Sequence, residues 1–174
     1  MKTIVFLGYS GSGKTRAIVS LIRELVKEGK KVGTLKSIHD GNFTVDTKGK
    51  DTWRHADAGA SVVVALLPKE LTTIEKTDTA DMTLDQLFDP FEKRGIDYLI
   101  VEGLYRKLAK RRDVVRVLCA RSDQEAVELL RMHPRPICIL NRKRSNRKFF
   151  QGLPLLQLPR DTKRLMDLIV SSSD

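Results

Sequence analysis

The chain has 174 residues, the length of one domain, and 41% of them are hydrophobic, so it can bury a substantial core. Charged residues make up 31%, and no apolar run approaches the length of a bilayer, which excludes a membrane-spanning helix. The net charge of +10 is uneven: residues 104–150 hold 14 Lys or Arg against four Asp or Glu, and the rest is balanced. This favours a local anionic partner. Few aromatic residues interleave with the basic ones, so nucleic acid is not the expected partner.

The first seven residues carry one positive charge and a short apolar stretch that runs directly into Gly8. A signal peptide needs a longer apolar region and a small-residue cleavage site, so we predict a buried strand here. Cys119 and Cys138 lie far apart, each within an apolar run, and we predict that both are buried, reduced thiols. Together these features predict a cytoplasmic protein.

Short apolar runs alternate with segments of helical periodicity along almost the whole chain. The predicted strands cover residues 3–7, 31–36, 60–67, 98–101, 114–120, 137–140 and 155–158, with residues 71–76 beside the third of them. The predicted helices cover residues 14–27, 51–58, 83–94 and 122–131 and a final segment from Asp161. Asp51 and Asp161 are predicted helix caps, and Ser122 with Glu125 forms a capping box. No repeat or linker divides the chain, so we predict a single domain, residues 1–174, with a mainly parallel sheet covered by helices on both faces.

The loop between the first strand and the first helix matches the phosphate-binding pattern G-x-x-x-x-G-K-[ST] in full. Its residues are Gly8, Tyr9, Ser10, Gly11, Ser12, Gly13, Lys14 and Thr15. Glycines let successive N–H groups point at phosphate oxygens, and the helix that follows adds its positive dipole end. We expect Lys14 to reach the β- and γ-phosphates and Thr15 to ligate Mg²⁺, and we include Arg16 in the site. The pattern predicts an α/β fold of the P-loop NTPase type that binds GTP or ATP with Mg²⁺.

Such a site needs a carboxylate that orients Mg²⁺ or the attacking water, usually at the end of a buried strand. Glu102 ends the apolar run of residues 98–101, and Gly103 lets the chain turn away beside it. A charge there is costly unless a cation pairs with it. We therefore predict that Glu102 contacts Mg²⁺, directly or through water, or acts as general base, with Lys14 as the second catalytic residue. The alternative is a strand-end carboxylate that faces solvent.

Residues 36–59 concentrate charged side chains, an indole and two histidines after the second predicted strand, where open α/β sheets bind ligands. With the phosphate loop, this segment resembles the molybdopterin-guanine dinucleotide biosynthesis adaptor family (MobB). The matching elements are the phosphate loop, Lys36, Asp46-x-x-Gly49-Lys50-Asp51-Thr52-x-Arg54, Ala58-Gly59-Ala60 and Val101-Glu102-Gly103. They cover residues 1–104, and we add Lys36, Asp46, Asp51 and Arg54 to the expected nucleotide site. The alternatives are a turn for Asp46, a helix cap for Asp51 and a packing role for Trp53.

The chain departs from the family pattern at two places. Ser37 follows Lys36 where the family has His, and only His39 remains nearby. After Gly103 the family continues Phe-Lys, whereas residues 104–107 here are Leu-Tyr-Arg-Lys. A basic segment at that point also suits the lid of a small-molecule kinase.

Asn141 follows the predicted strand 137–140, where many P-loop GTPases place the Asn of a guanine-binding N-K-x-D motif. Arg142 stands at the Lys position, but Arg144 replaces the Asp that binds the guanine N1 and N2 hydrogens. We predict a base contact for Asn141, and the preference for guanine rests on the resemblance.

The resemblance implies a GTP-binding adaptor that assists guanylyl transfer to molybdopterin in molybdenum cofactor synthesis. It implies a homodimer that hydrolyses GTP slowly at most, with a molybdopterin guanylyltransferase as partner and molybdopterin as a second candidate ligand. One alternative is a kinase that transfers the γ-phosphoryl group to a small molecule, with residues 106–112 as its lid. A nucleic-acid-linked ATPase is the third hypothesis.

Overall fold

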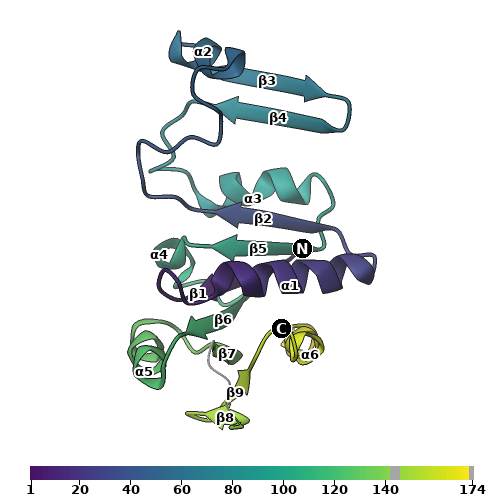
Figure 1. The fold of residues 1–174 in the computed structure, drawn as a ribbon, viewed down its shortest axis with the longest axis vertical. Helices are drawn as coiled ribbons and strands as arrows, with labels where there is room; N and C mark the ends of the chain where they lie inside the picture. Colours follow the sequence, from purple (N-terminus) through teal and green to yellow (C-terminus); the bar gives the residue numbers. More distant parts are fainter. Residues whose placement is uncertain (142–145, 173–174) are drawn as a thin grey trace. The chain divides into compact units, whose positions relative to one another are not determined.

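The computed structural model describes residues 1–141 and 146–172, and the chain divides into two compact units (Figure 1). The first unit combines Met1–Ser37 with Phe88–Asp174, and the second is Ile38–Leu87. The expected single domain stays a prediction. Within the described residues, no helix has both the length and the apolar character needed to cross a membrane.

The first unit is built on a sheet of seven strands in the order β2-β5-β1-β6-β7-β9-β8. The strands are β1 (Lys2–Leu7), β2 (Val32–Lys36), β5 (Tyr98–Glu102), β6 (Val114–Ala120), β7 (Cys138–Asn141), β8 (Phe149–Phe150) and β9 (Leu153–Leu156). All neighbouring strands are parallel except β8 and β9, which are antiparallel. β9 begins two residues before the predicted segment 155–158, and β8 was not predicted. Because parallel strands end at one edge of the sheet, the loops after β1, β5, β7 and β9 emerge at that edge.

Helices cover both faces of this sheet, as predicted (Figure 1). The helices involved are α1 (Lys14–Lys27), α5 (Asp123–Met132) and α6 (Thr162–Ser171). Val117 and Cys119 of β6 belong to the core under α1 and α6, whereas Leu118 and Ala120 belong to the core under α5. Every residue of β6 is buried, which explains why its sequence is nearly continuously apolar.

The helix caps agree with the sequence in part. The hydroxyl of Ser122 accepts a hydrogen bond from the Glu125 N–H at 3.2 Å, so this half of the capping box is confirmed. The Glu125 carboxylate instead accepts a hydrogen bond from Arg121 at 2.7 Å, so the reciprocal half of the box is not formed. Asp161 lies at the N-cap of α6 without a side-chain capping bond, and its carboxylate instead accepts the N–H of Gln157 at 2.7 Å. The prediction for Asp51 is wrong, because Lys50 is the N-cap of α2 (Asp51–Asp57) and Asp51 is the first helical residue. There its charge still favours the helix N-terminus.

Two further helices are α3 (Leu84–Glu92), which begins in the second unit and ends in the first, and α4 (Tyr105–Leu108), which belongs to the first unit. α3 begins at a reciprocal capping box, in which Thr83 and Gln86 exchange backbone-to-side-chain hydrogen bonds of 3.2 and 2.8 Å. Gly33 of β2 lies so close to the end of this helix that a Cβ atom there would be 2.6 Å from the Phe91 ring. This close approach explains a glycine inside a strand.

The second unit holds α2 and an antiparallel hairpin of β3 (Val62–Leu67) and β4 (Glu70–Glu75). The pairing of residues 71–76 beside the third predicted strand is thus confirmed. One face of β3 is largely exposed, with 52% of Val62, 56% of Val64 and 84% of Leu66 accessible to solvent. The hairpin is separate from the seven-stranded sheet, so its apolar sequence does not reflect burial between two helical layers.

Candidate nucleotide-binding site

The phosphate loop lies between β1 and α1, as predicted, and its backbone requires glycine at defined positions. Gly8, Gly11 and Gly13 have φ values of 145°, 74° and 94°, a region that residues with side chains rarely adopt. Gly8 also passes close to β6, because a Cβ atom on it would lie 2.3 Å from the carbonyl oxygen of Cys119. The loop is therefore held tightly against the end of the neighbouring strand.

Two side chains inside the loop have a chemistry that fits an anionic ligand. Ser12 is buried, and its hydroxyl has no hydrogen-bond partner among the described residues. The ammonium group of Lys14 donates to the carbonyl oxygens of Gly8 at 2.9 Å and Tyr9 at 2.8 Å. A buried hydroxyl without a partner is costly, and a phosphate oxygen would satisfy it. The same phosphate would draw the Lys14 cation away from neutral carbonyl oxygens.

The exposed polar residues at the loop and the start of α1 are Tyr9, Ser10, Thr15 and Arg16. The Tyr9 hydroxyl donates to a carboxylate oxygen of Glu128 on α5 at 2.8 Å, and this hydrogen bond raises the pKa of Tyr9 because it favours the protonated phenol. Tyr9 thereby attaches the loop to α5. The exposure of Thr15 at the first turn of α1 leaves its hydroxyl accessible to Mg²⁺.

Glu102 lies at the end of β5, between the ends of β1 and β2 in the sheet. Its register partners are Phe6 and Lys36, and the Lys36 ammonium group lies 3.8 Å from the Glu102 carboxylate. The expected cation beside this strand-end carboxylate is therefore present. The Glu102 side chain is 19% exposed, so it is neither fully solvated nor sealed in the core. Gly103 follows with φ 94° and turns the chain away, and a Cβ atom on it would lie 2.9 Å from the Cβ of Ser37.

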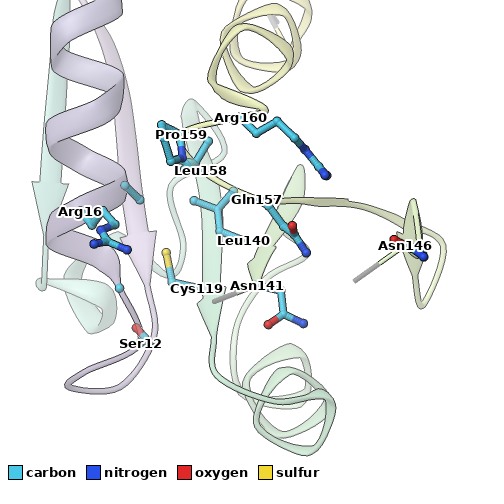
Figure 2. A pocket seen from close by; sticks show the side chains of 12 residues that line it. Ser12, Arg16, Cys119, Leu140, Asn141, Asn146, Gln157, Leu158, Pro159 and Arg160 are labelled. Atoms are coloured by element: carbon cyan, nitrogen blue, oxygen red, sulfur yellow. The ribbon is translucent and has the colours of Figure 1, made fainter. Parts of the chain in front are cut away.

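A cavity of about 570 Å³ extends from the phosphate loop to the ends of β7 and β9 (Figure 2). Its lining residues are Ser12, Gly13, Arg16, Ala17, Cys119, Leu140, Asn141, Asn146, Gln157, Leu158, Pro159 and Arg160. The predicted site residues Arg16 and Asn141 thus line the same space as the loop. Both cysteines are buried and unpaired as predicted, and burial raises the pKa of Cys119, so the thiol that lines the cavity stays neutral.

Asp46, Asp51 and Arg54 belong to the second unit, whereas the phosphate loop belongs to the first, and none of the three lines the cavity. One oxygen of Asp46 accepts the Thr47 N–H at 2.7 Å and the Thr52 hydroxyl at 3.0 Å. These hydrogen bonds hold the chain around Asp46 against the first turn of α2, so Asp46 has the turn role that was considered for it. Asp51 and Arg54 are exposed. Positions 142 and 144, which correspond to the Lys and Asp of the guanine-binding motif, lie outside the described residues.

Comparison with known proteins identifies the family of this chain. Residues 3–133 match the model of the family described as "Molybdopterin guanine dinucleotide synthesis protein B", MobB. The chain belongs to the MobB family. The resemblance carried by the sequence motifs is therefore confirmed.

Three relatives are named as molybdopterin-guanine dinucleotide biosynthesis adapter proteins. The protein of Haemophilus influenzae is 40% identical over 96 residues, 55% of this chain and 53% of that protein. The putative one of Methanocaldococcus jannaschii is 31% identical over 134 residues, 76% of this chain and 53% of that protein. The probable one of Bacillus subtilis is 29% identical over 166 residues, 95% of this chain and 89% of that protein. The chain thus spans about half the length of the first two relatives.

Solved structures of the family share the fold. The crystal structure of Bacillus subtilis MobB matches with a TM-score of 0.76 at 24% identity, over 100% of this chain and 99% of the other. A MobB homologue from Bacillus stearothermophilus matches with a TM-score of 0.70 at 19% identity, over 98% of this chain and 99% of the other. The predicted α/β fold with a mainly parallel sheet is confirmed.

Arg116, which lies buried in the middle of β6, was not predicted from the sequence. Its guanidinium donates to the carbonyl oxygens of Leu108 at 2.8 Å, Arg111 at 2.6 Å and Val114 at 3.2 Å. Burial lowers the pKa of Arg116, and the nearby Asp113 carboxylate opposes that shift. Arg116 thus fastens the segment that follows Glu102 to the sheet. A single charged residue inside an apolar strand was the signal that could have identified it.

A second contact holds the same segment. The ring of Tyr105 meets the His133 imidazole edge-on, with ring centres 5.4 Å apart. Burial and the positive charge of Arg116 lower the pKa of His133, so the imidazole stays neutral to a lower pH than usual.

Gln157 and Arg160 in the cavity were also missed, because they follow a strand whose position was predicted two residues too late.

Proposed function

We propose that the chain is a GTP-binding adaptor that assists guanylyl transfer to molybdopterin in molybdenum cofactor biosynthesis, with at most slow GTP hydrolysis. The observation that carries the nucleotide part is the cavity of about 570 Å³ that opens from a complete phosphate loop. The adaptor part is supported by membership of the MobB family and by the names of the relatives. ATP remains the alternative nucleotide.

The residues of the loop fit a magnesium triphosphate. Lys14 would exchange its two carbonyl contacts for the β- and γ-phosphates, and the Ser12 hydroxyl would gain a phosphate acceptor. The N-terminus of α1 adds backbone N–H groups and a positive dipole end. Thr15 and Glu102 would hold Mg²⁺, directly or through water, and the metal supplies neutralisation of the phosphate charge. Arg16 and Asn141 line the space that remains for the α-phosphate, sugar and base.

The kinase alternative requires a mobile basic lid at residues 106–112, because a kinase opens and closes over its acceptor. Arg116 binds the backbone carbonyl oxygens of Leu108 and Arg111 within this segment, and Tyr105, directly before it, contacts His133. A segment anchored through its own backbone is poorly suited to repeated opening. This anchoring supports the adaptor over the kinase.

We further propose that the protein forms a homodimer and engages a molybdopterin guanylyltransferase, with molybdopterin as a second candidate ligand. The support for self-association is the apolar face of the hairpin, where Leu71 of β4 is 63% exposed opposite Leu66 of β3. An isolated two-stranded hairpin is marginally stable in water, and a second apolar surface would cover this face. Sedimentation equilibrium of the purified chain tests the oligomeric state.

The nucleotide part is tested by calorimetric titration of Mg·GTP into the parent and Lys14→Ala. We expect affinity to fall about 10- to 150-fold, the worth of a charge-assisted hydrogen bond, with an unchanged circular dichroism spectrum. Lys27→Ala is the matched control, because Lys27 is exposed at the other end of α1, where it pairs with Glu24 at 2.6 Å. Unchanged GTP affinity in a folded Lys14→Ala variant would refute nucleotide binding by this loop.

The adaptor part is tested with the double variant Asp51→Asn and Arg54→Ala. We expect GTP affinity within about tenfold of the parent, because neither side chain belongs to the phosphate loop or lines the cavity, while stimulation of a guanylyltransferase on molybdopterin is lost. Asp57→Asn with Lys69→Ala makes the same charge changes at exposed positions of the second unit. A phosphorylated small molecule produced by the parent chain alone, and abolished by the double variant, would establish the kinase instead.

A further inference from the structure

We propose that one exposed surface beside the phosphate loop binds an acidic face of the guanylyltransferase, and that this binding responds to the nucleotide. The surface, which we call the Tyr9 surface, consists of Tyr9, Tyr105, Arg106 and Met132. This inference rests on the proposed function, because it locates the contact between the adaptor and its partner. The phosphate loop, α4 and α5 all belong to the first unit and lie at the left of Figure 1, where β5 and β6 end.

Contacts join these residues into one continuous surface. The Tyr9 hydroxyl lies 3.7 Å from the sulfur of Met132, the last residue of α5. The next residue, His133, meets the Tyr105 ring edge-on, and the Arg106 guanidinium lies 5.9 Å from the centre of that ring. Tyr9 is 37% exposed, Tyr105 41% and Met132 59%. Tyrosine, methionine and arginine are the residue types enriched where proteins bind one another, so this surface has the composition of an interface.

The charge around this surface favours an acidic partner. Residues 104–112 carry five Arg or Lys and no Asp or Glu. Within the described part of the chain, no carboxylate pairs with the exposed Arg106, whose guanidinium lies over the Tyr105 ring. The Glu128 carboxylate at this surface already accepts the Tyr9 hydroxyl. A protein face with carboxylates opposite Arg106 and apolar side chains opposite Met132 therefore complements the Tyr9 surface.

Tyr9 connects this surface to the phosphate loop through its own backbone. Its carbonyl oxygen accepts the Lys14 ammonium group at 2.8 Å and the Ser12 N–H at 3.2 Å. Its side chain is bound to Glu128 on α5. A triphosphate that takes over Lys14 removes the charged donor from this carbonyl and so changes the bonds that hold the Tyr9 peptide. The partner therefore meets a different Tyr9 surface in the empty and the occupied state.

The first test is calorimetric titration of a molybdopterin guanylyltransferase with the full chain. Met132→Ala should weaken binding about 5- to 30-fold, as truncation of a central interface residue does. Val26→Ala is the matched control, because Val26 is 55% exposed on α1, which covers the other face of the sheet from α5. Arg106→Glu should weaken binding about tenfold at low salt and less at high salt. Arg23→Glu makes the same charge change on α1 and should leave the affinity unchanged.

The second test concerns the response to nucleotide. In the parent, saturating Mg·GTP should change the affinity for the transferase by about 5- to 150-fold, the usual range of coupling between two sites. Glu128→Leu removes the acceptor of the Tyr9 hydroxyl, so the ratio of affinities with and without Mg·GTP should fall to within about twofold. The ratio cancels any direct contact between Glu128 and the partner. A parent affinity that ignores Mg·GTP, or an unchanged ratio in Glu128→Leu, would overturn this response.

The outcomes separate this inference from the proposed function. If the parent binds the transferase and both Met132→Ala and Arg106→Glu bind it equally well, the Tyr9 surface is not the contact and the adaptor function stands. If the parent does not bind the transferase with or without Mg·GTP, the partner part of the proposed function fails, and this inference fails with it. Loss of self-association in Met132→Ala, with transferase binding intact, would assign the surface to a second copy of the chain instead. All variants change exposed residues, and an Mg·GTP affinity within about threefold of the parent shows that they are folded.

Discussion

Arg116→Leu removes the guanidinium that fastens residues 108–111 to the sheet and leaves a shorter, apolar side chain in the strand. Three carbonyl oxygens within 3.2 Å lose a charged donor. A hydrogen bond to a charged group contributes ~1.5–3 kcal/mol, but these three share one cation, and its removal relieves the desolvation of a buried charge. We therefore expect the free energy of unfolding to fall by about 2–4 kcal/mol, or the melting temperature by about 5–15 °C.

Two measurements check this expectation. Urea unfolding followed by circular dichroism gives the change in stability. Limited trypsin digestion under native conditions, followed by mass spectrometry, reports local opening, because Lys110 lies in the fastened segment and Arg106 and Lys107 directly precede it. Cleavage there should accelerate in Arg116→Leu. Arg23→Leu, an exposed change on α1, should shift the free energy of unfolding by less than about 0.5 kcal/mol and leave the cleavage pattern unchanged.

Equal cleavage rates and equal stability in the parent and Arg116→Leu would show that the guanidinium does not hold this segment. The argument against a mobile lid would then fail, and the kinase hypothesis would regain its main structural requirement.

Two other predictions concern titratable groups. Glu102→Gln should leave nucleotide binding without Mg²⁺ nearly unchanged and lower the Mg²⁺-dependent release of phosphate; unchanged release would make Glu102 a structural strand end that only pairs with Lys36. The pKa of His133 is lowered from its ordinary value of 6.5, so the unfolded chain binds more protons and stability should fall as the pH drops below 6.5. His133→Phe keeps a ring against Tyr105 and should reduce the change in the free energy of unfolding with pH, measured by urea unfolding at several pH values. If the variant shows the same pH dependence as the parent, groups other than His133 cause it.

Much of the fold follows from local sequence patterns. Helix α1 and strand β6 have the predicted bounds, because a long amphipathic segment and a continuous apolar run each have one favourable arrangement. The strand-end position of Glu102 also followed from its sequence, since a charge directly after an apolar run marks the edge of a buried sheet. The phosphate loop was predictable because its chemistry fixes both residue types and spacing.

Features that depend on long-range pairing could not be predicted. Gln157 was assigned to a strand, because Leu155, Leu156 and Leu158 continue the apolar pattern past the point where pairing with β7 ends. The pairing of Lys36 with Glu102 depends on β2 and β5 being neighbours, which periodicity alone does not determine. Arg116 was missed for the same reason, since its acceptors lie on a turn that only the fold brings against β6.

Under the proposed function, the arrangement around the loop suits occupancy by nucleotide better than rapid turnover. Fast hydrolysis needs a carboxylate or amide that follows the γ-phosphate and orients water. Here the Glu102 carboxylate lies 3.8 Å from the Lys36 ammonium group, and the segment after it is fastened by Arg116. The carbonyl contacts of Lys14 also hold the loop in a formed state before any ligand arrives, so binding requires little ordering of the chain. A protein built in this way suits a role in which bound nucleotide, rather than its hydrolysis, supports the work of a partner.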